Sequence, residues 1–127
     1  MIRIYGLRQR LDPIKAKLSD VINGCMVDAL SFPASKRAHR FIPMDAEDFY
    51  YPEGRTDAYT VIEISLMEGR SVETRKKLIH LLFERTEGEL GIAPEDVEIT
   101  LCEAPAANWG FRGMTGDEAK LDYKVDV

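Results

Sequence analysis

Two ionisable side chains in this sequence could do chemistry on a small anion: an arginine at a predicted helix start and a histidine. Arg70 stands directly before Ser71, where an amphipathic helix is predicted to begin. A cation at that place opposes the helix dipole, so helix stability explains it poorly. A guanidinium can hold a planar carboxylate with two hydrogen bonds and polarise a neighbouring carbonyl. We therefore expect Arg70 to bind an anion, the alternative being an exposed surface arginine.

His39 lies in a basic cluster with Lys36, Arg37 and Arg40. The ordinary pKa of imidazole would let it transfer a proton near neutral pH, so His39 is a candidate proton shuttle or substrate-binding residue. The alternative for His39 is a packed surface side chain. For the cluster, a solvated charged face is the more common arrangement and a second anion site the alternative.

Metal and cofactor chemistry find little support in the sequence. The chain has two histidines and two cysteines, and their separations match no paired-ligand spacing. Cys25 and Cys102 lie in apolar patterns, so we expect two buried, reduced thiols. We predict no metal site and no cofactor.

The candidate residues must be positioned by two strand–helix–strand units of similar length. In the first unit, about residues 1–42, an alternating apolar run predicts a strand, and Asp12-Pro13 predicts a helix start. Pro33 stops that helix, and a second strand is expected from Ala38 to Ile42.

The second unit, about residues 59–127, repeats this order. A strand is predicted from Thr60 to Leu66, a helix from Ser71 to Gly91, and a strand from Val97 to Leu101. The tail alternates apolar and charged residues from Leu121 to Val127, which predicts an added edge strand.

Together the units predict a single α/β (α+β) domain over residues 1–127. Each crossover helix implies a parallel pair of strands, so we expect a four-stranded core sheet with two helices on one face. The other face should be bare and apolar, and self-association should bury it. The connector, about residues 43–58, is acidic and aromatic. We expect it to contact another subunit, the alternative being a lid over a pocket.

Composition excludes several classes of function. The formal net charge is −5, which argues against non-specific nucleic-acid binding. Charge is uneven: residues 1–42 hold eight basic against three acidic residues, and residues 43–127 hold nine against nineteen. No apolar run is long enough to span a membrane, and arginines interrupt the start where a signal peptide would be apolar. We expect a cytoplasmic protein.

Two short motifs, in this order, resemble the tautomerase superfamily. They are Glu68-Gly69-Arg70-Ser71 after a predicted strand and Asn108-Trp109-Gly110-Phe111-Arg112-Gly113 after the last one. The chain is similar to the fused β-α-β type, such as malonate semialdehyde decarboxylase and cis-3-chloroacrylic acid dehalogenase, over roughly residues 1–116. The resemblance implies a homotrimer that acts as a keto–enol tautomerase (an isomerase), or as a related decarboxylase or hydratase, on a small oxo-carboxylate.

The same resemblance implies roles for individual residues. Arg70 matches an arginine that binds the substrate carboxylate, Trp109 matches a pocket wall, and Asn108 is a further substrate-binding candidate. Met1 occupies the position of the family's catalytic N-terminal proline, which this chain lacks. Lys36 and Glu68 stand where malonate semialdehyde decarboxylase has an aspartate and an arginine.

The amine of Met1 could replace the missing proline. An unperturbed α-amine has a pKa near about 7.7–8.0, and an apolar pocket would lower it. A neutral amine at working pH could act as a general base or form a Schiff base with a carbonyl. The alternatives are an inert chain start, and a non-enzymatic relative that binds a small anion or serves only as an assembly.

Overall fold

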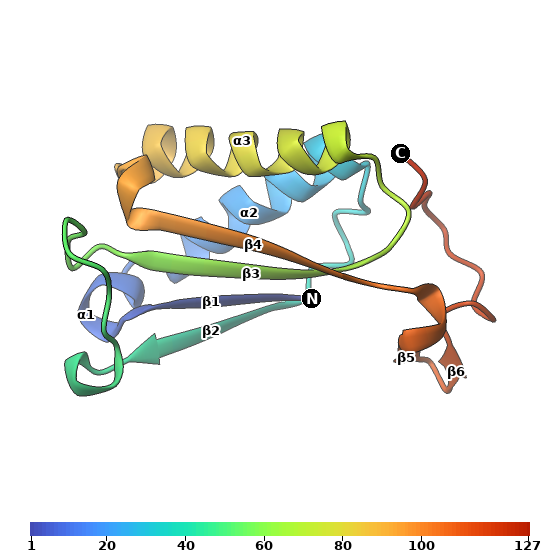
Figure 1. Ribbon diagram of the computed structural model, residues 1–127, viewed down its shortest axis with the longest axis horizontal. Coiled ribbons are helices and arrows are strands. Elements are labelled where there is room, and N and C mark those ends of the chain that lie inside the picture. Colours follow the sequence, from blue (N-terminus) through green and yellow to red (C-terminus); the bar gives the residue numbers. More distant parts are fainter.

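Four strands form the central sheet of the computed structural model, which describes residues 1–127 (Figure 1). β1 (Ile2–Leu7) and β3 (Thr60–Met67) lie in the middle, with β2 (His39–Met44) and β4 (Val97–Ala104) at the edges. β1 pairs in parallel with β2 and β3 with β4, whereas β1 and β3 are antiparallel. The predicted four-stranded sheet, built from two parallel pairs, is confirmed.

Two helices cover one face of this sheet, as predicted (Figure 1). They are α2 (Lys15–Leu30) and α3 (Val72–Leu90). Ser71 caps α3, since its side chain accepts a hydrogen bond from the Thr74 N–H at 3.1 Å. Gly91 ends α3 with a φ of 69°, a conformation that glycine adopts without a steric penalty. The core between sheet and helices is fully apolar at its centre: Ile4, Leu18, Ile22, Ile62, Ile64, Leu78 and Leu82.

The first long helix begins two residues later than predicted. A short helix, α1 (Arg8–Leu11), directly follows β1, and Asp12 ends it instead of capping the next helix. α2 then begins at Lys15. The early turn buries Leu11 to 1% exposure, so tertiary packing of this side chain overrides the local capping signal.

The tail does not form the predicted edge strand. Its alternating residues are half-buried from Leu121 to Val127, but they contact the segment between β3 and α3 and the segment after α2. The Ser71 N–H donates to the carbonyl of Val127 at 3.0 Å, and the ring of Tyr123 meets the ring of Phe32 at 4.9 Å. The alternating pattern therefore correctly indicated which side chains of the tail are buried. It did not indicate a strand, because β2 and β4 form the two edges of the sheet. A small hairpin precedes the tail, made of β5 (Gly110–Phe111) and β6 (Met114–Thr115).

The uncovered face of the sheet is more polar than predicted. Arg3 and Glu63 form an ion pair at 3.4 Å on the two central strands, and Ser65 lies beside them. These residues alternate with buried isoleucines, so they point away from the helices. The expectation of two buried thiols is also wrong for Cys102, which is exposed on β4, whereas Cys25 is buried. No helix has the length and apolarity needed to cross a membrane.

The connector folds back on its own chain. It contains the 3₁₀ turn η1 (Ala46–Asp48), and the rings of Phe49, Tyr51 and Tyr59 pack together with centroids 5.8–6.2 Å apart. Two further 3₁₀ turns, η2 (Pro94–Asp96) and η3 (Ala106–Asn108), flank β4. Tyr50 remains 89% exposed, so a subunit contact through this loop stays a prediction.

His39 fastens the start of β2 to α2. Its Nδ1 lies 2.8 Å from the Ser19 hydroxyl oxygen, which also accepts from Arg37 at 3.3 Å. Because the Ser19 oxygen already accepts from Arg37, its hydroxyl proton is free to donate to the imidazole. Burial and, next, the charge of Arg37 and of the chain's amine lower the pKa of His39 to about 4.

We expect the free energy of unfolding to decrease as the pH is lowered from about 6.5 to about 4, because His39 stays neutral in the folded chain over this range. The unfolded chain takes up a proton near the ordinary pKa of about 6.5, and the folded chain does not. With allowance for partial exposure, the loss should reach about 1–3 kcal/mol. His39→Gln should remove this component in urea unfolding at pH 7.5 and pH 4.5. The exposed His80→Gln is the matched control, and an unchanged pH dependence in His39→Gln would contradict the assignment.

Candidate functional site

Arg70 is a buried cation without an acidic partner. It lies three residues after the end of β3 and is 6% exposed. One guanidinium nitrogen, Nη1, donates to the carbonyl of Met67 at 3.2 Å, while Nε has no hydrogen-bond partner. The nearby Glu103 is already bound to Arg75 at 2.8 Å. Burial lowers the pKa of Arg70, although arginine remains charged in proteins. A buried, unpaired charge is costly, so this geometry suits a site that receives an anion.

Arg70 opens onto a cavity of about 460 Å³ at the end of the sheet where the N-terminus lies. Figure 1 shows this end, with the start of β1, the β5–β6 hairpin and the C-terminal segment around it. Four cationic side chains line the cavity and no carboxylate does. The lining includes Met1, Lys36, Arg40, Arg70, Trp109 and Arg112.

The register between β1 and β3 places the amine of Met1 in this cavity. Ile2 is opposite Ile64, so Met1 meets Ser65. The amine donates to the Ser65 carbonyl at 3.2 Å, and the Met1 carbonyl accepts from the Ser65 N–H at 2.9 Å. Burial lowers the pKa of the amine, and the charges of Arg3 and Arg40 lower it further. The neutral form, which can accept a proton, is therefore favoured relative to an exposed amine.

Trp109 contributes an apolar part of the wall. It follows η3, and its indole N–H donates to the Ala104 carbonyl at 3.3 Å. The Gly116 N–H donates to the Trp109 carbonyl at 2.7 Å. A side chain at Gly116 would collide with the carbonyl of Ala106, so glycine permits this close approach.

The structure brings together three of the five residues expected from the sequence. Met1, Arg70 and Trp109 line one cavity. His39 lies beside Met1 in a separate niche of about 20 Å³, and Asn108 is exposed outside the lining. Sequence reasoning missed the aromatic tail residue Tyr123, which packs into the wall because the tail crosses here, and it overlooked Arg112 within the second motif.

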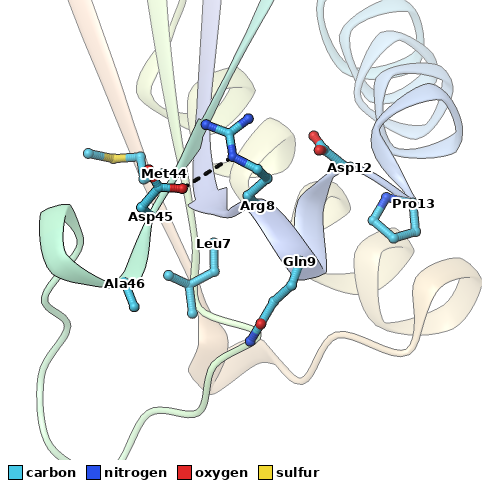
Figure 2. A pocket seen from close by; sticks show the side chains of 8 residues that line it. All are labelled: Leu7, Arg8, Gln9, Asp12, Pro13, Met44, Asp45 and Ala46. Carbon is cyan, nitrogen blue, oxygen red and sulfur yellow. Dashed lines mark hydrogen bonds and ion pairs between the residues drawn. The ribbon is translucent and has the colours of Figure 1, made fainter.

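A second cavity, of about 430 Å³, lies at the opposite end of β1 (Figure 2). Its arginine, Arg8, is paired with Asp45 at 3.3 Å, and the carboxylate of Asp12 also lines it. Asp45 belongs to an exposed acidic group with Glu47 and Asp48. Because its positive charge is already neutralised, this cavity lacks the anion-binding character of the first.

The chain matches known proteins over most of its length. A family model described as "Tautomerase enzyme" matches residues 36–112, well over half of the chain. The probable tautomerase YrdN of Bacillus subtilis is 32% identical over 100 residues, which cover 75% of this chain and 77% of YrdN.

Two solved structures have a fold similar to that of this chain. Malonate semialdehyde decarboxylase is 27% identical with a TM-score of 0.81, and the match covers 90% of this chain and 92% of that one. A fused 4-OT, described as an asymmetric trimer, has a TM-score of 0.81 at 23% identity, covering 91% of this chain and 95% of that one. Its likeness concerns the fold alone. From its sequence match and its four-stranded architecture, the chain belongs to the tautomerase family.

Proposed function

We propose that the cavity binds a small 2-oxo acid or its enol and that the amine of Met1 transfers a proton between carbon and oxygen. One observation carries the proposal: the buried guanidinium of Arg70 lacks an anionic partner and faces the cavity that also holds the Met1 amine. The activity is keto–enol tautomerisation, in line with the name of the relative from B. subtilis.

The substrate carboxylate would take the unused donors of Arg70. Nη1 is held by the Met67 carbonyl, so the guanidinium is already oriented, and because Nε is closed to solvent the carboxylate would bind the guanidinium N–H groups that face the cavity. A guanidinium beside the substrate also stabilises the negative charge that develops on the enolate oxygen. Arg70 therefore binds the substrate and polarises its carbonyl.

The Met1 amine would carry the proton. In the enol-to-keto direction the neutral amine accepts the hydroxyl proton, and the resulting ammonium delivers a proton to the neighbouring carbon. The amine is neutral again at the end, so the cycle balances. Trp109 and Tyr123 keep the proton transfer away from bulk water, because both line the cavity.

A non-enzymatic role remains the second candidate. It would need only Arg70, and one observation favours it: the Met1 amine is already engaged as a donor to Ser65. The solved relative is described as having decarboxylase and hydratase activities, which are the alternative reactions for the same cavity.

Replacing Arg70 should weaken carboxylate binding strongly without unfolding the protein. Losing one charge-assisted contact costs about 1.5–3 kcal/mol, so Arg70→Met should weaken 2-oxobutanoate binding at least about tenfold in calorimetry. Its melting temperature should stay equal or rise, because a buried charge without a partner is removed. Arg8→Gln, at the other cavity, is the matched control. Equal affinity in Arg70→Met and the wild type would refute the anion site.

The rate of enol-to-keto conversion of phenylenolpyruvate should rise with pH and then level off. The midpoint should lie below about 7.7–8.0, because burial, Arg3 and Arg40 lower the pKa of the amine. Arg40→Gln should move the midpoint to higher pH. A one-residue extension before Met1 turns the amine into an amide and should remove activity while Arg70 still binds carboxylates. Mass spectrometry must first show a free Met1 amine, and full activity of the extended protein would exclude it as the base.

We also propose that the protein assembles as a homotrimer through the uncovered sheet face and the connector. The fused 4-OT of the same fold is described as a trimer, and Tyr50 is free to contact a neighbour. Sedimentation at micromolar concentration should give about three times the chain mass of 14.4 kDa. A stable monomer would rule out this assembly.

A further inference from the structure

Arg112 occupies a backbone position that does not suit it. It is the first residue of the two-residue turn between β5 and β6, with a φ of 54°, and Gly113 follows with a φ of 76°. A turn with positive φ at both central residues favours asparagine, aspartate or glycine at the first position. A long side chain in this conformation is uncommon and unfavourable. The hairpin itself does not require arginine there.

The contacts of Arg112 do not explain it either. Its guanidinium lies over the ring of Phe111 at 5.1 Å and reaches the Lys120 carbonyl at 3.4 Å. No carboxylate is paired with it. The nearby Asp122 is bound to Lys36 at 2.7 Å. The charge of Arg112 is therefore held at the cavity by weak contacts and remains available.

The distribution of the ten arginines makes this observation sharper. Six form ion pairs with acidic residues: Arg3, Arg8, Arg10, Arg37, Arg75 and Arg85. Of the four without an acidic partner, only Arg55 lies elsewhere, whereas Arg40, Arg70 and Arg112 line the same cavity. Three of the four unpaired guanidinium groups therefore lie at one cavity. Their combined positive charge exceeds the single negative charge of one carboxylate.

We propose that Arg112 forms a second anion-binding site in the outer part of the cavity and that the preferred substrate carries two acid groups. This inference rests on the proposed function, since one carboxylate is assigned to Arg70. Arg70 is buried and Arg112 is exposed, so they offer an inner and an outer contact. The apolar side chains of Trp109 and Phe111 line the same cavity and suit a short carbon chain. Arg112 is a specificity-determining residue, because it acts on a part of the ligand away from the transferred proton.

Two acids of equal chain length test the proposal: 2-oxoglutarate and 2-oxopentanoate, which differ only in the second carboxylate. In calorimetry at fixed ionic strength, the wild type should bind the diacid at least about tenfold more tightly. Arg112→Asn should remove this preference and weaken the monoacid far less than the diacid. The melting temperature of Arg112→Asn should stay equal or rise, because asparagine tolerates positive φ. If Arg112→Asn is more stable and binds the diacid less tightly, the loss of affinity comes from a lost contact with the ligand and not from a damaged fold.

Two variants keep the outcome specific. Arg8→Gln removes the same charge at the opposite end of β1, and it should preserve the preference for the diacid. Arg70→Met should weaken both ligands. An equal loss of diacid affinity in Arg8→Gln, or a wild type without preference, would overturn the role of Arg112 while Arg70-dependent monoacid binding upheld the proposed function. If neither acid binds the wild type, the proposed function fails and this inference fails with it.

Discussion

The antiparallel pairing of β1 with β3 determines the geometry of the candidate site. It joins the two parallel strand pairs into one sheet, and its register places Met1 opposite Ser65. β3 then runs on to Met67, whose carbonyl holds the guanidinium of Arg70. A slip of one residue would turn the buried isoleucines outward, so the hydrophobic core enforces this register. The core therefore positions the amine and the arginine at the same cavity, although they are far apart along the chain.

The charges around the cavity oppose stability and support binding. An unpaired buried guanidinium costs free energy in the empty protein, and an arginine at positive φ adds to that cost. Most other arginines of the chain form ion pairs with acidic residues, and the chain has more acidic than basic residues. The arginines at the cavity therefore lack partners although acidic residues are plentiful. Burial lowers the pKa of the Met1 amine, and the charges of Arg3 and Arg40 lower it further, because both effects disfavour its charged form. Arg40, which lines the cavity, therefore contributes both to its positive charge and to the availability of the neutral amine.

The expectations that failed did so for definite physical reasons. The capping signal at Asp12 lost to the burial of Leu11, which a local pattern cannot weigh. The tail alternates as a strand does, yet its side chains contact Gly69 and Phe32, because alternation specifies which side chains pack and not which partner they meet. The tail contributes Leu121 and Tyr123 to the cavity, so the second error concealed part of its wall, whereas Asp12 lies at the opposite end of β1.

The sequence by itself determined the two strand–helix–strand units, their parallel pairing, the caps at Ser71 and Gly91 and the likeness to the tautomerase superfamily. These features depend on local periodicity and on short motifs, which a chain carries in its order of residues. Only the tertiary structure decided that Asn108 lies outside the cavity, that His39 is fastened to Ser19, and that Arg112 has no acidic partner. Such facts depend on distances between residues remote in sequence, and these are set by the packing of the core and the path of the tail.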